Sequence, residues 1–149
     1  MTQKETIEKF YKAFQELDVK TMNSCYHKNI EFTDPGFGTL YGDEARNMWI
    51  MICERAKNFS LTYSKLTESS AHWEAKYDFS KTRRKVHNKI DAYFEFKDGL
   101  IIKHLDTFNL HKWASQALGF KGWLLGGTPF FKKKLNRQTK QMLVKYMQK

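Results

Sequence analysis

A turn, a strand and a helix follow one another without a break between Asp98 and Gly119, and this stretch constrains the fold more than any other part of the chain. Its strand carries His104 and Asp106 two residues apart, so both side chains leave the same face. If that face is the core face, two ionisable groups enter an apolar interior, which is unfavourable unless they have a partner or a use. The direction of this face therefore decides what the two residues can do.

The turn before the strand admits two registers, and a one-residue slip exchanges the two faces. A two-residue loop at 98–99 would pair Lys97 with Leu100 and place both ionisable residues on the polar face. A three-residue loop at 97–99, with glycine in the left-handed position, pairs Phe96 with Leu100 instead. The two loops make opposite predictions for the same strand.

Burial favours the three-residue loop, because the two-residue loop would bury Lys103 beside Phe94. The three-residue loop pairs Phe94 with Ile102 and sends Lys103 outward. It also places Ala92 opposite His104. The favoured register predicts that the ionisable pair faces the core.

Three polar side chains then meet on the core face. In the favoured register Ile90 lies opposite Asp106, and Asn88 lies on the same face of the neighbouring strand. We therefore expect His104, Asp106 and Asn88 to form one wall of a cavity.

The composition predicts a folded domain with a hydrophobic core. Its 149 residues fit one domain, and 41% hydrophobic with 15% aromatic residues argues against disorder. No apolar run approaches the roughly 20 residues that span a bilayer, and the polar N-terminus does not resemble a signal peptide. Cys25 and Cys53 suggest no disulfide framework, and no cluster has metal-ligand spacing. We expect a cytoplasmic protein with no metal and no cofactor.

The order of the predicted elements indicates an α+β fold. Helical spacing of apolar residues predicts helices at 2–17, 18–26, 43–56 and 109–118, and from 128 onward. Alternation predicts strands at 30–34, 59–67, 71–79, 86–97 and 100–108. We expect a cone-shaped, curved, mixed or antiparallel sheet wrapped around the N-terminal helices, with extra C-terminal helices. One domain would span 1–149, with its core at about 4–118 and a helical extension at about 119–149.

The extension combines apolar and basic residues. Positions 131–149 hold seven lysines and arginines and no acidic residue. A basic amphipathic helix can bind an anionic membrane or an acidic partner, but a docking helix with a solvated basic face is the simpler interpretation. Nucleic acid is not expected, because no aromatic platform accompanies the charges. The apolar side chains of the extension should pack on a pocket mouth or on a partner subunit. They are Phe120, Trp123, Leu124, Leu125, Phe130 and Phe131.

Several short motifs together resemble the nuclear-transport-factor-2-like superfamily, especially its SnoaL-like polyketide cyclase and ketosteroid isomerase branches. These motifs are Tyr26 with Ile30-Glu31-Phe32-Thr33-Asp34-Pro35, Gly42 opening a helix, Val86-His87-Asn88, Phe94-Glu95-Phe96-Lys97-Asp98-Gly99-x-Ile101, and His104-x-Asp106-x-Phe108. The resemblance covers about residues 4–118. It implies a cystatin-like α+β roll with a conical pocket, and frequently a homodimer formed through the sheet.

The resemblance also implies roles for particular residues. Ketosteroid isomerases hold their general base in an Asp-Pro at the end of the first strand, which Asp34 matches. Their oxyanion-hole tyrosine and acid correspond here to Phe10 and about Ala92, so that mechanism is not expected. Polyketide cyclases use an aspartate of the last strand as acid/base, and Asp106 is the nearest match. Limonene-epoxide hydrolases need an Asp–Arg–Asp set, for which Arg46 is the only interior candidate, so that branch ranks lower.

We take Asp106 as the candidate acid/base, assisted by Asp34 and His104. A carboxylate in an apolar pocket has its pKa raised toward neutrality, which suits proton abstraction beside a carbonyl. Alternatively, His104 and Asp106 satisfy each other structurally, and Asp34 forms an Asx turn before Pro35. Large side chains would line the pocket for a flat apolar ligand or simply form the core, and Tyr11 could donate a hydroxyl hydrogen bond. The candidate pocket residues are Tyr11, Phe14, Phe32, Trp49, Tyr77, Asn88, Phe94 and Phe108.

Two functions follow from these observations. The first is binding of an apolar small molecule with metal-free lyase, isomerase or cyclase chemistry on a carbonyl compound. The second is a non-catalytic ligand-binding or dimerising module that contacts a partner or anionic surface through its basic C-terminal helix. We expect an apolar small molecule and a second copy of the chain as partners, and we do not favour a membrane surface.

Overall fold

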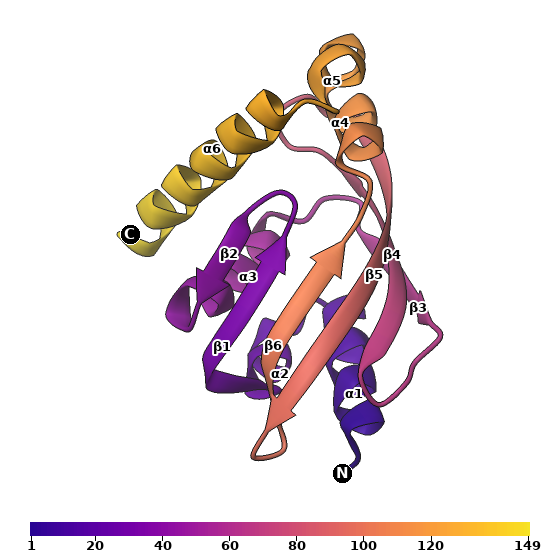
Figure 1. Cartoon of the computed structure of the whole chain (residues 1–149), viewed down its shortest axis with the longest axis vertical. Coiled ribbons are helices and arrows are strands. Elements are labelled where there is room, and N and C mark those ends of the chain that lie inside the picture. Colours follow the sequence, from indigo (N-terminus) through magenta and orange to yellow (C-terminus); the bar gives the residue numbers. More distant parts are fainter.

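Six strands form a single curved sheet in the computed structural model, which describes all residues 1–149 (Figure 1). The elements are α1 (Gln3–Gln15), α2 (Val19–Ser24), β1 (Tyr26–Asp34), β2 (Gly38–Tyr41), α3 (Asp43–Arg55), β3 (Ser60–Ser64), β4 (Ser70–Asp78), β5 (Lys85–Lys97), β6 (Leu100–Thr107), α4 (Leu110–Leu118), α5 (Phe120–Leu125) and α6 (Pro129–Met147). The strand order is β2-β1-β6-β5-β4-β3, with β1 and β6 parallel and all other neighbours antiparallel. The predicted α+β fold with a mixed sheet is confirmed.

Local signals in the sequence explain where the first helix begins and which face it buries. The predicted capping box forms, because Thr2 Oγ1 accepts from Glu5 N and Glu5 Oε1 accepts from Thr2 N. The apolar stripe of α1 then packs with α3 on the inner face of the sheet. Its fully or almost fully buried side chains are Ile7, Phe10, Tyr11 and Phe14 from α1 and Ala45, Met48 and Trp49 from α3.

The β5–β6 hairpin corrects the predicted turn. Its loop has two residues, because Lys97 pairs with Leu100 and both Asp98 and Gly99 have positive φ, 54° and 78°. Such a turn matches the twist of the strands it joins. A β-bulge follows at once, where Ile102 is the extra residue between two successive cross-strand pairs. The prediction of a three-residue loop was therefore wrong.

The bulge returns the side chains of β6 to the faces on which the predicted loop would have placed them. His104 pairs with Phe94 and Asp106 with Ala92, instead of the expected Ala92 and Ile90. Both ionisable side chains nevertheless face the core, at 1% and 3% exposed. The predicted direction is confirmed, although the predicted pairs were wrong by two residues. Ile101 is fully buried in place of the expected Ile102.

The C-terminal helix α6 packs against the rest of the molecule. Asn136 Nδ2 donates to the carbonyl oxygens of Pro35 and Gly36, both at 2.8 Å, in the turn between β1 and β2. Leu143 is 1% exposed, and the Tyr146 hydroxyl donates to the Glu54 carboxylate of α3. Figure 1 shows α6 lying across the open end of the sheet, where β1 and β6 end. Residues beyond the predicted core thus close one side of the fold.

None of the helices has the length and apolar character required to cross a membrane.

Candidate functional site

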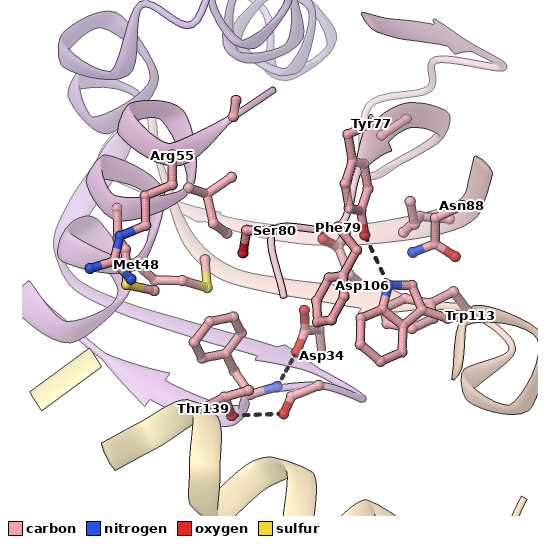
Figure 2. Close-up of a pocket in the computed structure, with 18 of the residues that line it drawn as sticks. Asp34, Met48, Arg55, Tyr77, Phe79, Ser80, Asn88, Asp106, Trp113 and Thr139 are labelled. Atoms are coloured by element: carbon pink, nitrogen blue, oxygen red, sulfur yellow. Dashed lines mark hydrogen bonds between the residues drawn. The ribbon is translucent and has the colours of Figure 1, made fainter. Parts of the chain in front are cut away.

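A cavity of about 300 Å³ lies between the carboxyl ends of β1 and β6, helix α3 and helix α6. This volume is at the lower end of the range for sites that bind small molecules. Most residues of its wall are hydrophobic, and Asp34, Asp106 and Asn88 are among the polar ones. Figure 2 shows the two carboxyl groups among aromatic side chains, with Phe79 and Trp113 beside them.

The parallel pairing of β1 with β6 brings the two aspartates together. Phe32 is paired with His104 and Thr33 with Leu105, so Asp34 and Asp106 occupy the next positions of the same register. Side chains alternate along both strands, so the two aspartates share the inner face with Phe32 and His104. Because parallel strands end at the same edge, two carboxyl groups 72 positions apart in sequence reach one cavity.

Asp106 is held from one side and open on the other. Its Oδ1 atom accepts from His104 Nε2 at 2.9 Å and from Trp73 Nε1 at 3.3 Å. Its Oδ2 atom accepts no hydrogen bond from another protein group and keeps some accessible surface. The side chain is therefore fixed through Oδ1, and Oδ2 is the atom available to a ligand in the cavity.

The hydrogen bonds behind His104 determine which of its nitrogens carries the proton. Trp49 Nε1 can only donate, and it donates to the Tyr26 hydroxyl oxygen at 2.9 Å. The Tyr26 hydroxyl lies 2.7 Å from His104 Nδ1 and has no other acceptor, so its proton is assigned to this bond. His104 then carries its own proton on Nε2 and donates it to Asp106. Every donor in this chain of contacts points toward Asp106.

His104 acts through Asp106, because its own side chain does not reach the cavity wall. The ring is surrounded by Phe10, Phe32, Phe94 and Trp49, with ring centroids 4.5 to 6.2 Å away. Both of its nitrogens have protein partners. Burial in the same region raises the pKa of the Tyr26 hydroxyl well above its usual value, so Tyr26 stays protonated.

Asp34 differs from Asp106 in its surroundings. Its Oδ1 accepts from the Phe37 amide at 2.6 Å, which closes the turn that the sequence suggested after this strand. Burial raises the pKa of the Asp34 carboxyl to about 7, the negative charge of Asp106 adds to the rise, and the hydrogen bonds from the backbone oppose it. Near neutral pH this carboxyl is present in both protonation states.

Five of the eight candidate pocket residues line the cavity, namely Phe14, Trp49, Tyr77, Asn88 and Phe108. The other three lie in the packed core beneath it, and these are Tyr11, Phe32 and Phe94. Tyr11 stacks between neighbouring aromatic rings, and its buried hydroxyl has no hydrogen-bond partner. It therefore does not supply the hydroxyl donor to the cavity that its position in the sequence suggested.

Part of the wall comes from elements whose position the sequence did not reveal. Trp113 of α4 donates from Nε1 to the Tyr77 hydroxyl at 2.8 Å, and Phe79 packs against it edge to face (Figure 2). Leu135, Thr139 and Met142 of α6 also line the cavity. Their i, i+4, i+7 spacing marks one helix face, which was the available signal. The sequence did not show that this face covers the carboxyl ends of β1 and β6.

No arginine joins the two aspartates. Arg46 bonds to Asp43 and to the carbonyl oxygens of residues 27 and 28, outside the cavity wall. Arg55 lies at the cavity edge, with its guanidinium 5.2 Å from the Tyr146 ring centroid. Neither arginine forms an ion pair with Asp34 or Asp106. The geometry thus lacks the Asp–Arg–Asp set of limonene-epoxide hydrolases, and no group of three His, Cys, Asp or Glu side chains is arranged for a metal.

Comparison with known families agrees with this architecture. The family model of the SnoaL-like domain matches residues 7–104. The chain belongs to the SnoaL-like family. The matched residues include His104 and stop just before Asp106, and the α6 side of the cavity lies outside them. A search of curated protein sequences found no match to this SnoaL-like protein.

Solved structures share the fold across most of the chain. A nuclear-transport-factor-2-like protein of unknown function from Burkholderia pseudomallei is 17% identical, with a TM-score of 0.68 over 79% of this chain and 99% of that chain. A proposed polyketide cyclase from Pseudomonas putida is 15% identical, with a TM-score of 0.61 over 78% and 98%. An LEH-like epoxide hydrolase from M. tuberculosis is 20% identical, with a TM-score of 0.60 over 83% and 90%. At these identities the likeness is one of fold.

Proposed function

We propose that this SnoaL-like protein binds an apolar carbonyl compound in the cavity and moves a proton at the carbon next to the carbonyl group. The observation that carries the proposal is the pair of carboxyl groups, Asp34 and Asp106, at adjacent strand ends in one apolar cavity. Two such groups in different environments can divide the roles of acid and base between them. Chemistry of this type belongs to isomerases, cyclases and lyases that need no metal.

The free oxygen of Asp106 is the base in this proposal. Oδ2 removes a proton from the carbon, the electron pair of the broken C–H bond forms a C=C bond to the carbonyl carbon, and the π electron pair of the C=O bond moves to the carbonyl oxygen. Asp34 in its protonated form donates its proton to that oxygen, giving a neutral enol and an ionised Asp34. Return of the proton from Asp106 to another carbon of a conjugated enol, while Asp34 takes back the enol proton, completes an isomerisation. Attack of the enol carbon on a second carbonyl group, whose oxygen takes the proton from Asp106 while Asp34 takes back the enol proton, would close a ring.

His104 is a positioning residue. Its Nε2–H bond to Oδ1 fixes the plane of the Asp106 carboxylate, so that Oδ2 points away from the core. Trp73 bonds to the same Oδ1 atom and restricts the carboxylate further. The rigid aromatic packing around His104 should keep this geometry unchanged when the cavity is empty or filled.

Hydrogen–deuterium exchange at the α-carbon of apolar cyclic ketones tests the proposal directly. In D₂O the wild-type protein should catalyse exchange, and Asp106→Asn should reduce the rate by about 100-fold or more, the usual size of a general-base effect. Glu95→Gln, an exposed residue on the other face of the hairpin, is the matched control and should leave the rate unchanged. Equal rates for wild type and D106N would contradict the proposal.

A non-catalytic ligand-binding protein is the second candidate. The observation in its favour is that both nitrogens of His104 already have protein partners, as in a purely structural pair. In that case the ketones would bind and quench the fluorescence of Trp113, while wild type and D106N would both fail to exchange the α-proton.

We also propose that two copies of the chain associate through the outer face of the sheet. Tyr41, Tyr93 and Leu105 are 60%, 51% and 42% exposed and come from β2, β5 and β6. Exposed apolar side chains on a sheet face are suited to pairing with a second copy. Light scattering should give the mass of a dimer, and Tyr93→Lys together with Leu105→Lys should give a monomer.

A further inference from the structure

Helix α5 presents its large apolar side chains to solvent and its glycine to the protein. Phe120, Trp123, Leu124 and Leu125 are 74%, 58%, 58% and 43% exposed, whereas Gly122 is buried. Phe130, at the start of α6, is 69% exposed. A short helix that only needed to pack on its own domain would bury the aromatic side chains instead. We call these five apolar residues the α5 patch.

The contacts of α5 with α4 hold this orientation in place. A Cβ atom at Gly122 would overlap the Ala114 carbonyl oxygen, so only glycine allows the two helices to approach this closely. His111 Nε2 donates to the Trp123 carbonyl oxygen at 2.7 Å. The rings of Phe120 and Trp123 stack on each other with centroids 6.0 Å apart. The outward direction of the patch is thus set by backbone contacts.

The segments around the patch carry a large excess of positive charge. Residues 107–149 hold nine lysines and arginines and no aspartate or glutamate. Residues 79–85, which lead into β5, add four more and no acid, and Arg84 donates to the Gln116 carbonyl oxygen next to α5. Lys121 lies within α5, and Lys132, Lys133 and Lys134 follow Phe130 in the first turns of α6. All four of these lysines are exposed.

We propose that the α5 patch docks the protein on an anionic lipid membrane, with the aromatic side chains entering the interface and the surrounding lysines and arginines contacting lipid headgroups. Amphipathic aromatic rings flanked by basic residues are the combination that binds such interfaces, and each lysine near the surface adds to the attraction. In Figure 1 α5 forms the tip of the molecule's long axis, at the end that holds the cavity and away from the N-terminus. The patch can therefore meet a flat surface without hindrance from the sheet.

Charge decides between a membrane and a second copy of the chain. Two copies that met through this patch would bring two strongly basic regions together, and like charges at close range repel. The flanking charges leave an anionic surface as the complementary partner. This proposal differs from the sequence-based expectation, which did not favour a membrane, because the sequence did not show that the α5 aromatics remain uncovered. It is independent of any chemistry in the cavity.

Vesicle co-sedimentation of the full-length protein tests the proposal. The protein should bind phosphatidylcholine vesicles that contain phosphatidylserine, bind pure phosphatidylcholine vesicles much less, and lose binding as the salt concentration rises. Phe120→Ser with Trp123→Ser should weaken partitioning about 100-fold or more. Replacing Lys132, Lys133 and Lys134 with Gln should weaken it about 100-fold. Val144→Ser, at a residue 47% exposed further along α6, is the control and should bind as wild type does.

A second variant keeps the test valid if the double variant folds poorly. Trp123→Phe retains the apolar surface and should bind vesicles as wild type does. Quenching of fluorescence by brominated phosphatidylcholine should be strong in wild type and largely lost in W123F, because the side chains of the other tryptophans face the core or the cavity; these are Trp49, Trp73 and Trp113. Binding that survives F120S/W123S, or binding by wild type with no quenching that depends on Trp123, would overturn the proposal and leave charge adsorption only. Self-association through the patch, with no binding to the vesicles, would also overturn the proposal.

Discussion

His104 and Asp106 lie two residues apart on β6 and are joined by a 2.9 Å hydrogen bond from Nε2 to Oδ1 inside the aromatic core. The bond links the Tyr26 hydroxyl and Trp49, deep in the core, to a carboxylate that opens on the cavity. Because each group in this chain is buried and has a partner, removal of one takes a hydrogen bond from each of its buried neighbours.

Replacing His104 with Ala should therefore destabilise the protein by about 3–5 kcal/mol, since the Tyr26 hydroxyl loses its acceptor and the Asp106 carboxylate loses one of its two donors. Urea unfolding of wild type and variant measures the difference. His72→Ala, on the partly solvated outer face where His72 bonds to Asp91 and Glu74, should lose about 1 kcal/mol or less. Similar losses for the two variants would show that the buried network contributes no more than a surface contact.

The Asp34 carboxyl should make the protein less stable as the pH rises. Its pKa is about 7 in the folded protein, against the ordinary value of 3.8, so the folded state binds more protons between these values. Stability falls when the folded state binds more protons than the unfolded state, so it should decline from about pH 4 to about pH 7. The free energy of unfolding of Asp34→Asn should fall by about 2–4 kcal/mol less than that of wild type over this pH range. Urea unfolding at several pH values would contradict the assignment if D34N followed the wild-type curve.

The rate of α-proton exchange should also depend on the protonation of the Asp34 carboxyl. If protonated Asp34 donates to the carbonyl oxygen, the α-proton exchange rate should fall as the pH rises through about 7. Asp34→Asn should be slower and should show no inflection near that pH, because an amide donates a hydrogen bond but no proton. A wild-type rate that keeps rising above neutrality would assign the base role to Asp34 instead.

Loosening α6 should open the cavity while leaving the sheet intact. Asn136→Ala removes the two hydrogen bonds to the carbonyl oxygens of Pro35 and Gly36 and should cost about 1–3 kcal/mol. Amide hydrogen exchange in α6 should accelerate, while exchange in β5 and β6 stays slow. Gln141→Ala, an exposed residue on the same helix, serves as the control and should exchange at the wild-type rate.

Packing between α4 and α5 should tolerate no side chain at Gly122. Alanine normally favours a helix by about 1 kcal/mol over glycine. Here its Cβ would overlap the Ala114 carbonyl oxygen, so Gly122→Ala should destabilise the protein by about 1–3 kcal/mol. A Cβ at Gly127 would meet only His111 side-chain atoms, the nearest at 3.7 Å, so Gly127→Ala should be close to neutral. Thermal unfolding of the two variants compares them directly.

Local patterns in the sequence were sufficient for the fold class and for most of the elements, although they predicted neither strand β2 nor helix α5. The capping box at Thr2 and Glu5, the apolar stripes of α1 and α3, and the alternation along β5 depend on neighbours within a few residues. Such signals carry over to the folded protein because the periodicity of a helix or strand decides which side chains share a face. They were also enough to recognise the SnoaL-like family and to select Asp34, His104 and Asp106.

The meaning of those three residues was decided by contacts that are distant in sequence. Energetic preference for a two-residue turn and a compensating bulge at Ile102 set the register of β6, and counting along the hairpin could not reveal both. Parallel pairing of β1 with β6 placed Asp34 beside Asp106, and α6 closed the cavity over them. Burial among these elements raised the pKa of Asp34, and close packing at Gly122 turned the α5 aromatics outward. Local sequence thus determined which residues were available, while long-range packing decided which of them meet and which remain exposed.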